Sequence, residues 1–481
     1  MKGKTTLIHN ASFVIGCEND EHYIMPDGEV AYRDDTILFV GKKYGGQADE
    51  KIDAKRAIVS PGFLNLHVHL QGACLERNIL PDTGSPFHYM SGLFRMARPL
   101  QVAPEDERAM FELAIAELMS KGTTTVFHQG YGLDDVVKTL GESGLRVVYG
   151  HGASTTRFTS QDGKSVTYAP KPKGKDFEDL HAAMELRAKY DGAFDGRMTI
   201  AMSLNQADTC SPELLDEAAG ILRSDGDLIC CIHAAQSIVE YLHITQTYGV
   251  TPAHFLHDHG ICGPNVHYGH YFMPSGHSMN TMKLEGELEL IADDGTHVMH
   301  CPLSFGRRGM LLESFQKYHD MGINMGIGTD TMPLDIVMEM RYAAVFCKIA
   351  EGGNPLKGTA ATVFNAATTD GARALHRSDL GRLEPGCKAD IVLIDTLNTD
   401  CTPVRDPIKT IVYSASGSDV SSVIVNGERI VRDGLPVNID LEKIVNKAQE
   451  GYDRALELYP RAHCAGLTHW QFSPMSFPLR D

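Results

Sequence analysis

Two histidines one residue apart, His67 and His69, lie in the segment NLHVHL at residues 65–70. Imidazole nitrogens bind zinc and iron(II), so a His-x-His pair is a candidate half of a metal site. The motif alone says little, because 22 histidines in 481 residues give roughly one such pair by chance. A second pair, His257 and His259, ends the amphipathic stretch TPAHFLHDHG. A helix C-terminus favours histidine through its dipole, so we interpret this second pair as structural.

Four more side chains that could bind a metal or move a proton lie in comparable places. His233, His270 and His300 lie at or near the ends of apolar segments, and Asp330 ends another. Three histidines and one carboxylate, drawn from these residues and the His67–His69 pair, would form a set of nitrogen and oxygen ligands that suits zinc or iron(II) and leaves room for water. Each residue taken singly is as often structural, so the elements that carry them must bring them together.

Eight short apolar segments alternate with stretches of helical periodicity through the middle of the chain. This alternation is typical of a parallel sheet covered on both sides, and eight units favour a closed (β/α)8 barrel. An open doubly wound sheet is the alternative, although the chain has no glycine-rich nucleotide loop of either common form. The predicted strands are residues 62–69, 122–129, 145–152, 197–204, 228–235, 265–272, 296–303 and 323–330.

A barrel would place the candidate residues on one face. The carboxyl ends of all its strands open on the same side, where active sites are built. Residues i and i+2 of a strand point the same way, so His67 and His69 can both face the barrel interior. His233 and Asp330 then join them from the fifth and eighth predicted strands.

Both ends of the chain have the pattern of β-structure. Residues 1–60 contain several short candidate strands, and residues 379–440 contain more, including a hairpin with Asn-Gly at its turn. Neither end alone is large enough for a good sandwich, so we predict one small β-sandwich domain built from both. Residues 61–378 then form the metal-dependent catalytic barrel, and residues 441–481 form a C-terminal helix and tail.

The composition excludes several classes of function. A net charge of −18 disfavours nucleic acid and anionic membranes as partners, because both need a basic surface. No uninterrupted apolar span of about 18 residues occurs, and the first residues lack the features of a signal peptide. The 11 scattered cysteines contain no Cys-x-x-Cys pair and indicate buried thiols in a reducing compartment. We therefore expect a cytoplasmic protein with a small-molecule partner.

Several motifs lie along the chain in a recognisable order. They are PGFLNLHVHLQG (61–72), GTTTV (122–126), HAAQ (233–236), YGHYF (268–272), HCPLS (300–304), GIGTD (326–330) and DLGRLEPGCKADIVLID (379–395). Through them the chain resembles the amidohydrolase superfamily, in its cytosine deaminase-like and triazine hydrolase-like branch. The resemblance runs nearly end to end. Its first and last motifs are specific for the superfamily but not for any one substrate.

The resemblance implies a role for each candidate residue. The metal ligands would be His67, His69, His233 and Asp330. The metal would lower the pKa of its bound water towards about 7 and so supply hydroxide at neutral pH. Asp330 would act both as ligand and as proton acceptor, and His270 would orient or polarise the substrate.

The fourth predicted strand bears on the number of metal ions. Binuclear members of the superfamily use a bridging lysine or glutamate near its end, whereas this chain has Asn205 and Gln206 there. We therefore expect one divalent ion, zinc first and iron(II) as the alternative. His300 matches a histidine that often touches the substrate. Glu76, Asn205 and Phe305 complete the expected pocket, where Phe305 departs from the asparagine that relatives often carry.

Gln236 is the most informative departure. The resemblance implies a glutamate here, three residues after His233, which shuttles a proton. A glutamine can form hydrogen bonds but cannot carry a proton at neutral pH. Either His270, Asp330 or Glu76 performs the shuttle, or the leaving group needs little protonation. A halide, thiolate or phenolate fits the second case better than an amine does.

Two enzymatic hypotheses and one non-enzymatic hypothesis follow. The first is that metal-bound hydroxide attacks an electrophilic carbon of a small nitrogen-rich, heteroaromatic substrate and releases ammonia, an amine or another leaving group, including a halide or thiolate. The alternative is hydrolysis of acyclic amides, ureas or carbamates at the same site. A binding protein that retains only the metal cage is the third. Arg307 and Arg308 could form a solvated loop or contact an anion. Similar enzymes are often homo-oligomers, and we expect a homodimer.

Overall fold

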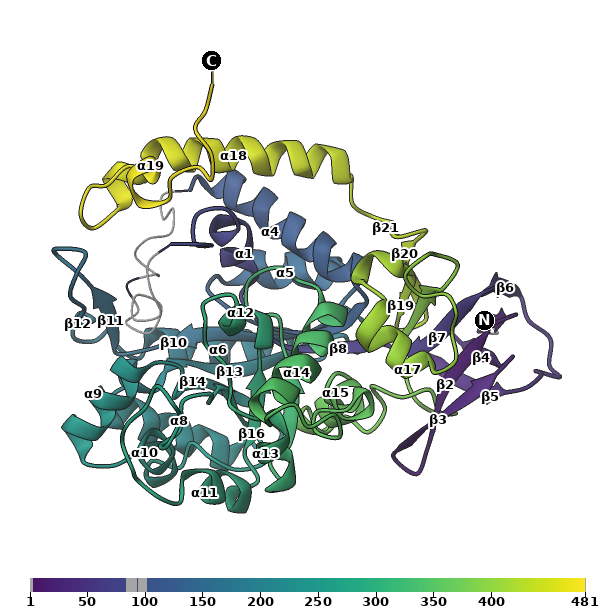
Figure 1. Cartoon of the computed structure of the whole chain (residues 1–481), viewed down its shortest axis with the longest axis horizontal. Helices are drawn as coiled ribbons and strands as arrows, with labels where there is room; N and C mark the ends of the chain where they lie inside the picture. The colour runs from purple at the N-terminus through teal and green to yellow at the C-terminus, as the bar shows by residue number, and fades with distance from the viewer. Residues whose placement is uncertain (1–2, 84–92, 94–101, 481) are drawn as a thin grey trace.

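The computed structural model describes residues 3–83, 93 and 102–480. One sheet of parallel strands lies at its centre, and each strand falls within or beside a segment predicted from the sequence, which confirms the barrel (Figure 1). Neighbouring strands pair in chain order from first to last. The strands are β8 (Phe63–Val68), β9 (Thr123–Gly130), β10 (Arg146–Ala153), β13 (Met198–Gln206), β14 (Cys230–Ala234), β15 (Val266–His270), β16 (His297–His300) and β17 (Met325–Ile327).

The barrel closes between its last strand and its first. The backbone N–H of Asp330 donates to His67 O at 2.9 Å, and the N–H of His69 donates to Asp330 O at 2.6 Å. Gly328 makes this close approach possible, since a Cβ at this position would lie 2.6 Å from the backbone oxygen of His67. The seam thus places an aspartate directly beside the His-x-His pair.

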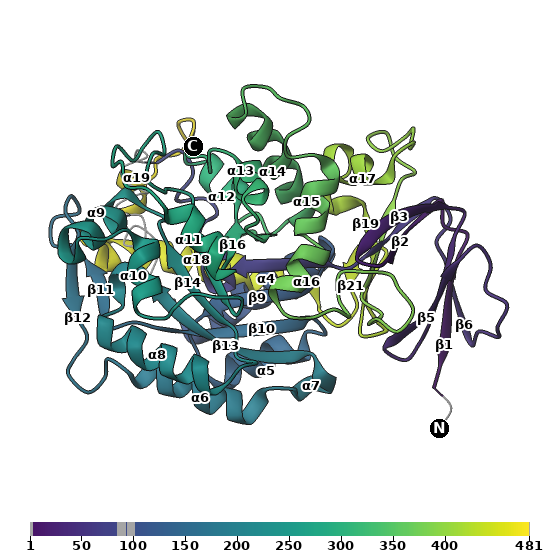
Figure 2. The ribbon, with the colours of Figure 1, turned by 90° about the horizontal axis from the view of Figure 1, so that it is seen from below.

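Helices cover the outside of the sheet (Figure 2). The main apolar core lies between the two layers, where strand residues Val147 and Ile200 share a cluster with helix residues Leu186 and Leu215. The helices that follow the strands are α1 (Leu70–Glu76), α4 (Pro104–Ser120), α5 (Asp134–Glu142), α6 (Glu178–Tyr190), α7 (Ala193–Gly196), α8 (Pro212–Ser224), α9 (Ile238–Tyr248), α10 (Pro252–Asp258), α11 (Glu287–Asp294), α12 (Pro302–Gly306), α13 (Phe315–Asp320), α14 (Ile336–Ala350), α15 (Ala360–Ala366) and α16 (Thr369–Ala374). A small hairpin, β11 (Thr156–Thr159) and β12 (Thr167–Pro170), follows β10.

Two further sheets form a sandwich beside the barrel (Figures 1 and 2). One has strand order β5-β4-β1-β6, and the other has order β21-β20-β19-β18-β7-β2-β3 and so combines both chain ends, as predicted. The first sheet comprises β1 (Thr5–His9), β4 (Glu29–Arg33), β5 (Thr36–Gly41) and β6 (Glu50–Asp53). The second comprises β2 (Phe13–Glu18), β3 (Glu21–Pro26), β7 (Ala57–Pro61), β18 (Ile391–Asp395), β19 (Val420–Val425), β20 (Glu428–Arg432) and β21 (Leu435–Pro436). Ile8 and Val30 of one sheet share an apolar cluster with Val59 and Ile391 of the other.

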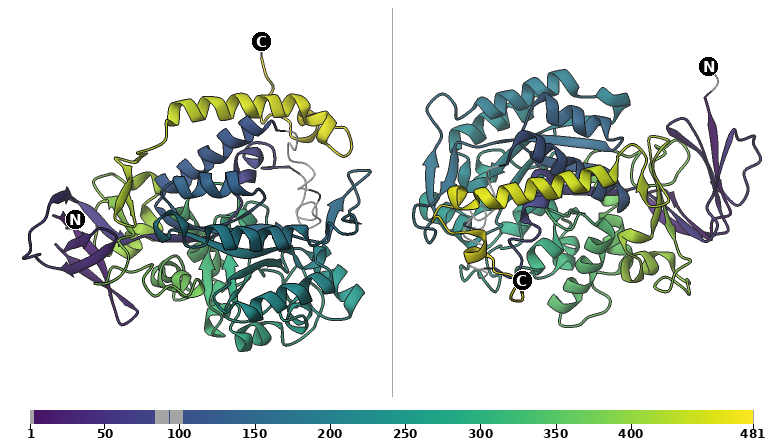
Figure 3. Two further views of the ribbon diagram at one scale, coloured as in Figure 1. Left: turned by 180° about the vertical axis from the view of Figure 1, so that it is seen from behind. Right: turned by 90° about the horizontal axis from the view of Figure 1, so that it is seen from above.

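The predicted hairpin and C-terminal helix are both present. Asn426 and Gly427 join β19 to β20 with φ values of 53° and 79°, as the tight turn requires. The long helix α18 (Leu441–Ala462) lies along α4 (Figure 3), where Arg454 pairs with Asp106. Short helices α17 (Pro407–Lys409) and α19 (His469–Phe472) complete the chain. No helix in the described residues is long and apolar enough to cross a membrane.

Candidate metal centre and substrate cavity

Three histidines converge at the carboxyl end of the barrel. His67 and His69 come from the end of β8 and His233 from β14, and one ring nitrogen of each lies within 4.8 Å of the others. The Nε2 atoms of His69 and His233 are 3.0 Å apart. The structure thus brings together the three histidines predicted as ligands.

Hydrogen bonds determine which ring nitrogens face one another. The Nδ1 of His69 lies 2.8 Å from the backbone oxygen of Gln129, and the Nδ1 of His233 contacts the backbone oxygen of Asn205. Since a carbonyl oxygen only accepts, each neutral ring carries its proton on Nδ1. The two Nε2 lone pairs then face each other, and a cation between them removes their repulsion.

His67 supplies a third lone pair to the same place. Its Nε2 is buried and has no hydrogen-bond partner among the described residues. Its Nδ1 lies 2.9 Å from the side-chain amide of Gln129. An amide oxygen turned to Nδ1 would accept its proton and leave Nε2 open, which is the usual support for a metal-binding histidine. These three ring nitrogens are suitable ligand atoms for a divalent cation.

Asp330 supplies the carboxylate. Its Oδ1 lies 3.6 Å from the Nε2 of His69, and its Oδ2 accepts a hydrogen bond from the hydroxyl of Ser304. Burial alone would raise the pKa of Asp330, but nearby positive charge, including that of the Arg308 guanidinium, holds that pKa well below its usual value. The side chain is therefore an ionised carboxylate with one oxygen turned towards the histidines.

His270 lies directly beside this cluster. Its ring centroid is 4.4 Å from that of His67 and 5.4 Å from that of His233. Burial and the neighbouring His233 lower the pKa of His270 far below its ordinary value, so the ring is neutral. Its Nδ1 is buried without a hydrogen-bond partner in the described residues. Phe305 packs edge-on against the ring at 4.6 Å and limits its movement.

A cavity of about 360 Å³ opens above the cluster. This volume suits a small ring compound. Its lining includes His69, His233, His270 and Asp330, together with the predicted pocket residues Glu76, Asn205 and Gln236. The polar groups therefore converge on one space from several strands and from the segments that follow them.

The arginine pair after Phe305 is not a solvated loop. Arg308 is only 8% exposed and lines the cavity, where its Nη2 lies 3.7 Å from Oε2 of Glu76. Arg307 donates to the hydroxyl of Thr331 at 3.0 Å. Glu76 therefore already balances charge at Arg308, and a contact between these arginines and an anionic substrate stays a prediction.

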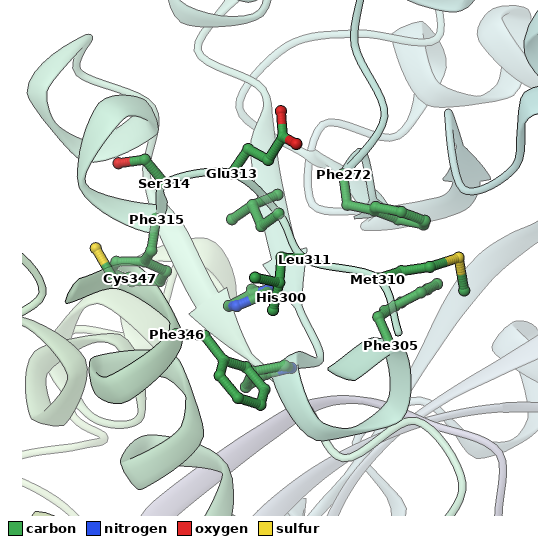
Figure 4. Close-up of a pocket in the computed structure, with 12 residues that line it drawn as sticks. Phe272, His300, Phe305, Met310, Leu311, Glu313, Ser314, Phe315, Phe346 and Cys347 are labelled. Atoms are coloured by element: carbon green, nitrogen blue, oxygen red, sulfur yellow. The ribbon is translucent and has the colours of Figure 1, made fainter. Parts of the chain in front are cut away.

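His300 has a different environment from the other histidines. Figure 4 shows it in a small pocket with Phe272, Phe305 and Phe315, and its ring lies 5.8 Å from that of Phe315. Burial lowers the pKa of His300 to about 3, so the ring is neutral. Since His300 does not line the 360 Å³ cavity, its contact with substrate stays a prediction, and so does the contact of Phe305.

The rival pair, His257 and His259, is directed elsewhere. The Nδ1 of His257 lies 3.0 Å from Asp294, and the Nδ1 of His259 lies 2.7 Å from Asp216. The two rings therefore turn to different aspartates, so the pair does not form one site.

Comparison with known proteins identifies the family. A model of the amidohydrolase family matches residues 58–430 of this chain. The chain belongs to this family. The enzyme class predicted from the sequence, a hydrolase of carbon–nitrogen bonds other than peptide bonds, is thereby confirmed.

Curated amidohydrolase relatives match most of the chain. The 5-methylthioadenosine/S-adenosylhomocysteine deaminase of Natronomonas pharaonis is 32% identical over 89% of this chain and 92% of its own length. The 5'-deoxyadenosine deaminase of Methanosarcina mazei is 30% identical over 88% of this chain and 92% of its own length.

Solved structures share the fold. An adenosine deaminase from Xanthomonas campestris with bound zinc has a TM-score of 0.81 at 22% identity and covers 94% of this chain and 99% of its own. The atrazine chlorohydrolase from Arthrobacter aurescens, complexed with zinc, has a TM-score of 0.79 at 22% identity and covers 93% of this chain and 100% of its own.

Two residues near this amidohydrolase site could not be predicted from the sequence. Gln129 lies one residue before the end of β9 and contacts both His67 and His69, yet a glutamine in this position gives no chemical signal by itself. Glu240 lies buried at the start of α9 and accepts a hydrogen bond from Gln206. In the sequence, the spacing between Ser237 and Glu240 indicates only the start of a helix and gives no sign that Glu240 is connected to the cavity.

Proposed function

We propose that this amidohydrolase removes a substituent from a small nitrogen-rich heteroaromatic ring by hydrolysis at a single divalent metal. The observation that carries the proposal is the convergence of three histidine nitrogens and the Asp330 carboxylate at the floor of a 360 Å³ cavity. Relatives named as deaminases of adenosine derivatives support a ring substrate. A structural neighbour named as an atrazine chlorohydrolase supports a wider range of leaving groups.

The proposed metal ligands are His67, His69, His233 and Asp330, and zinc is the expected ion. When bound, such an ion supplies Lewis acidity that lowers the pKa of a coordinated water to about 7. The fourth barrel strand ends in Asn205 and Gln206 and offers no bridging lysine. We therefore propose one metal ion per site.

The side chains of His270 and Asp330 would contact the substrate ring or take up a proton. The neutral ring of His270 lines the cavity and would hydrogen-bond a ring nitrogen or a developing negative charge there. Ser304 holds one carboxylate oxygen of Asp330. The other oxygen, turned to the histidines, would take up a proton.

Gln236 bears on the leaving group. It lines the cavity, yet its amide cannot deliver a proton to a departing amine. We propose that the enzyme favours leaving groups of low basicity, such as a halide or thiolate, over a plain amine. His270, Asp330 and Glu76 are the groups that could move a proton where one is needed.

The test is a substrate panel on the purified protein after its metal content is measured. One triazine ring carries chloride, methylthio or amino groups in turn, and adenosine, 5'-deoxyadenosine and a phenylurea complete the panel. We expect displacement from a ring compound, loss of that activity with 1,10-phenanthroline, and its return with added zinc. Turnover of the phenylurea alone, or no turnover by metal-loaded protein, would contradict the proposal.

The assembly and location remain part of the proposal. We propose a homodimer in the cytoplasm, and the 11 cysteines support a reducing compartment because all are free thiols. Light scattering during size-exclusion chromatography measures the oligomer directly.

A further inference from the structure

A chain of hydrogen bonds runs from the buried carboxylate of Glu240 to the amide of Gln236. The side-chain nitrogen of Gln206 donates to Oε2 of Glu240 at 3.2 Å, and the side-chain nitrogen of Gln236 donates to Oε1 of Gln206. Gln206 ends β13 and is buried, whereas Gln236 is half-buried at the cavity wall. These hydrogen bonds therefore link buried Glu240, in the first turn of α9, to the substrate cavity.

Glu240 determines which group donates and which accepts in each of these hydrogen bonds. Its Oε1 accepts the backbone N–H of Ala235 at 2.7 Å, and its Oε2 accepts that of Gln236 at 3.0 Å. Both oxygens are therefore acceptors, and Gln206 must present its NH₂ to them. The carbonyl of Gln206 must then face Gln236, which in turn must present its own NH₂ to Gln206.

The backbone around Gln236 is held by the same carboxylate. Ala235 has a φ of 45°, a conformation that non-glycine residues rarely adopt. The backbone N–H of Ala235 donates to the carboxylate of Glu240. The hydroxyl oxygen of Ser237 caps helix α9 by accepting the backbone N–H of Glu240 at 3.0 Å. Glu240 therefore fixes both the loop and the amide that projects from it.

One acceptor is left over at the cavity. Among the described residues, Oε1 of Gln236 has no hydrogen-bond partner. We propose that Glu240, acting through Gln206, fixes the amide of Gln236 with this carbonyl oxygen offered to the substrate, so that the cavity selects rings that carry an N–H donor there. Glu240 and Gln206 are positioning residues, and Gln236 determines specificity. The inference rests on the proposed ring-hydrolase function.

The experiment compares melamine with 2,4,6-trimethyl-1,3,5-triazine, which exchanges amino groups for methyl groups of similar size. Calorimetry gives both dissociation constants for the metal-loaded protein, with ammonia release followed in the same samples. Gln236→Met should reduce the preference for melamine about tenfold, since one hydrogen bond is lost. Gln206→Met should reduce it by a smaller factor, because the amide is then free to turn. Gln236→Glu keeps an acceptor and should keep the preference.

Gln71 provides a matched control in the same cavity. Both ends of its amide are engaged by the backbone of Tyr131, so Gln71→Met should leave the preference unchanged. Thermal unfolding and metal content show that each variant is folded, and Gln236→Met decides the matter if Gln206→Met does not fold.

The possible failures are distinct. The inference is wrong if Gln236→Met leaves the preference for melamine unchanged, or if Gln71→Met changes that preference equally. Turnover of a ring compound would in that case still support the proposed function. If no ring compound is bound or turned over, the proposed function fails and the inference fails with it.

Discussion

The residue at position 236 bears on how protons could move in the proposed active site. A glutamate there could give and take a proton, whereas the amide of Gln236 can only hold one arrangement of donors and acceptors. The neighbouring Gln206 presents its carbonyl to that amide. The same carbonyl would accept a hydrogen bond from a protonated carboxyl group, so the surroundings could accommodate an acid.

Gln236→Glu therefore tests the leaving-group proposal. The introduced carboxyl group should donate a proton to a departing amine and raise amine release relative to chloride release by on the order of 100-fold. Amine release should then fall as pH rises through the pKa of the new group, because only the protonated form donates. Ammonia and chloride are measured from matched triazines across the neutral pH range. An unchanged ratio together with an unchanged pH profile would refute the idea.

At the scale of single elements, strands could be predicted well and side-chain directions less well. Buried barrel strands such as Cys230–Ala234 are mostly apolar runs, so their positions follow from the sequence. His300 ends a strand of only four residues that leads at once into α12. A strand end tells where such a side chain begins but not which pocket it enters, and His300 enters the aromatic pocket of Figure 4.

Contacts between distant elements explain the rest of what the sequence could not predict. The link between Gln206 and Glu240 spans 34 residues, and that between Gln129 and His67 spans 62. No local pattern encodes either pairing. The four proposed metal ligands could be anticipated because each carries its own chemical signal at a strand end, whereas the amides that support them are recognised only once the fold is known.

At the scale of the whole molecule, one buried ion pair joins the barrel to the sandwich. Arg146 of β10 donates from Nε and Nη2 to both carboxylate oxygens of Asp390, at 2.9 and 3.1 Å. Asn426, at the hairpin turn, donates its backbone N–H to the same carboxylate at 2.7 Å. Both charged side chains are 3% exposed. The two parts of the chain are therefore coupled through a fully satisfied carboxylate.

Arg146→Met should lower the free energy of unfolding by about 3–5 kcal/mol, because it leaves the charge of Asp390 buried without its partner. Urea denaturation measures the change. Arg108→Met is the matched control, since Arg108 pairs with Glu112 at the surface, and exposed pairs contribute only about 0–1 kcal/mol. Equal effects of the two substitutions would show that the buried pair does not couple the domains.

We propose that His67 and His69, rather than His257 and His259, hold a single catalytic metal ion. Mass spectrometry of metal content per chain, after removal of loosely bound ions, tests it most directly. We expect one equivalent in the wild type and in the double variant His257→Ala/His259→Ala, and far less than one in His67→Ala/His69→Ala. Full metal content in His67→Ala/His69→Ala, or loss of metal from His257→Ala/His259→Ala, would contradict this assignment of the metal site.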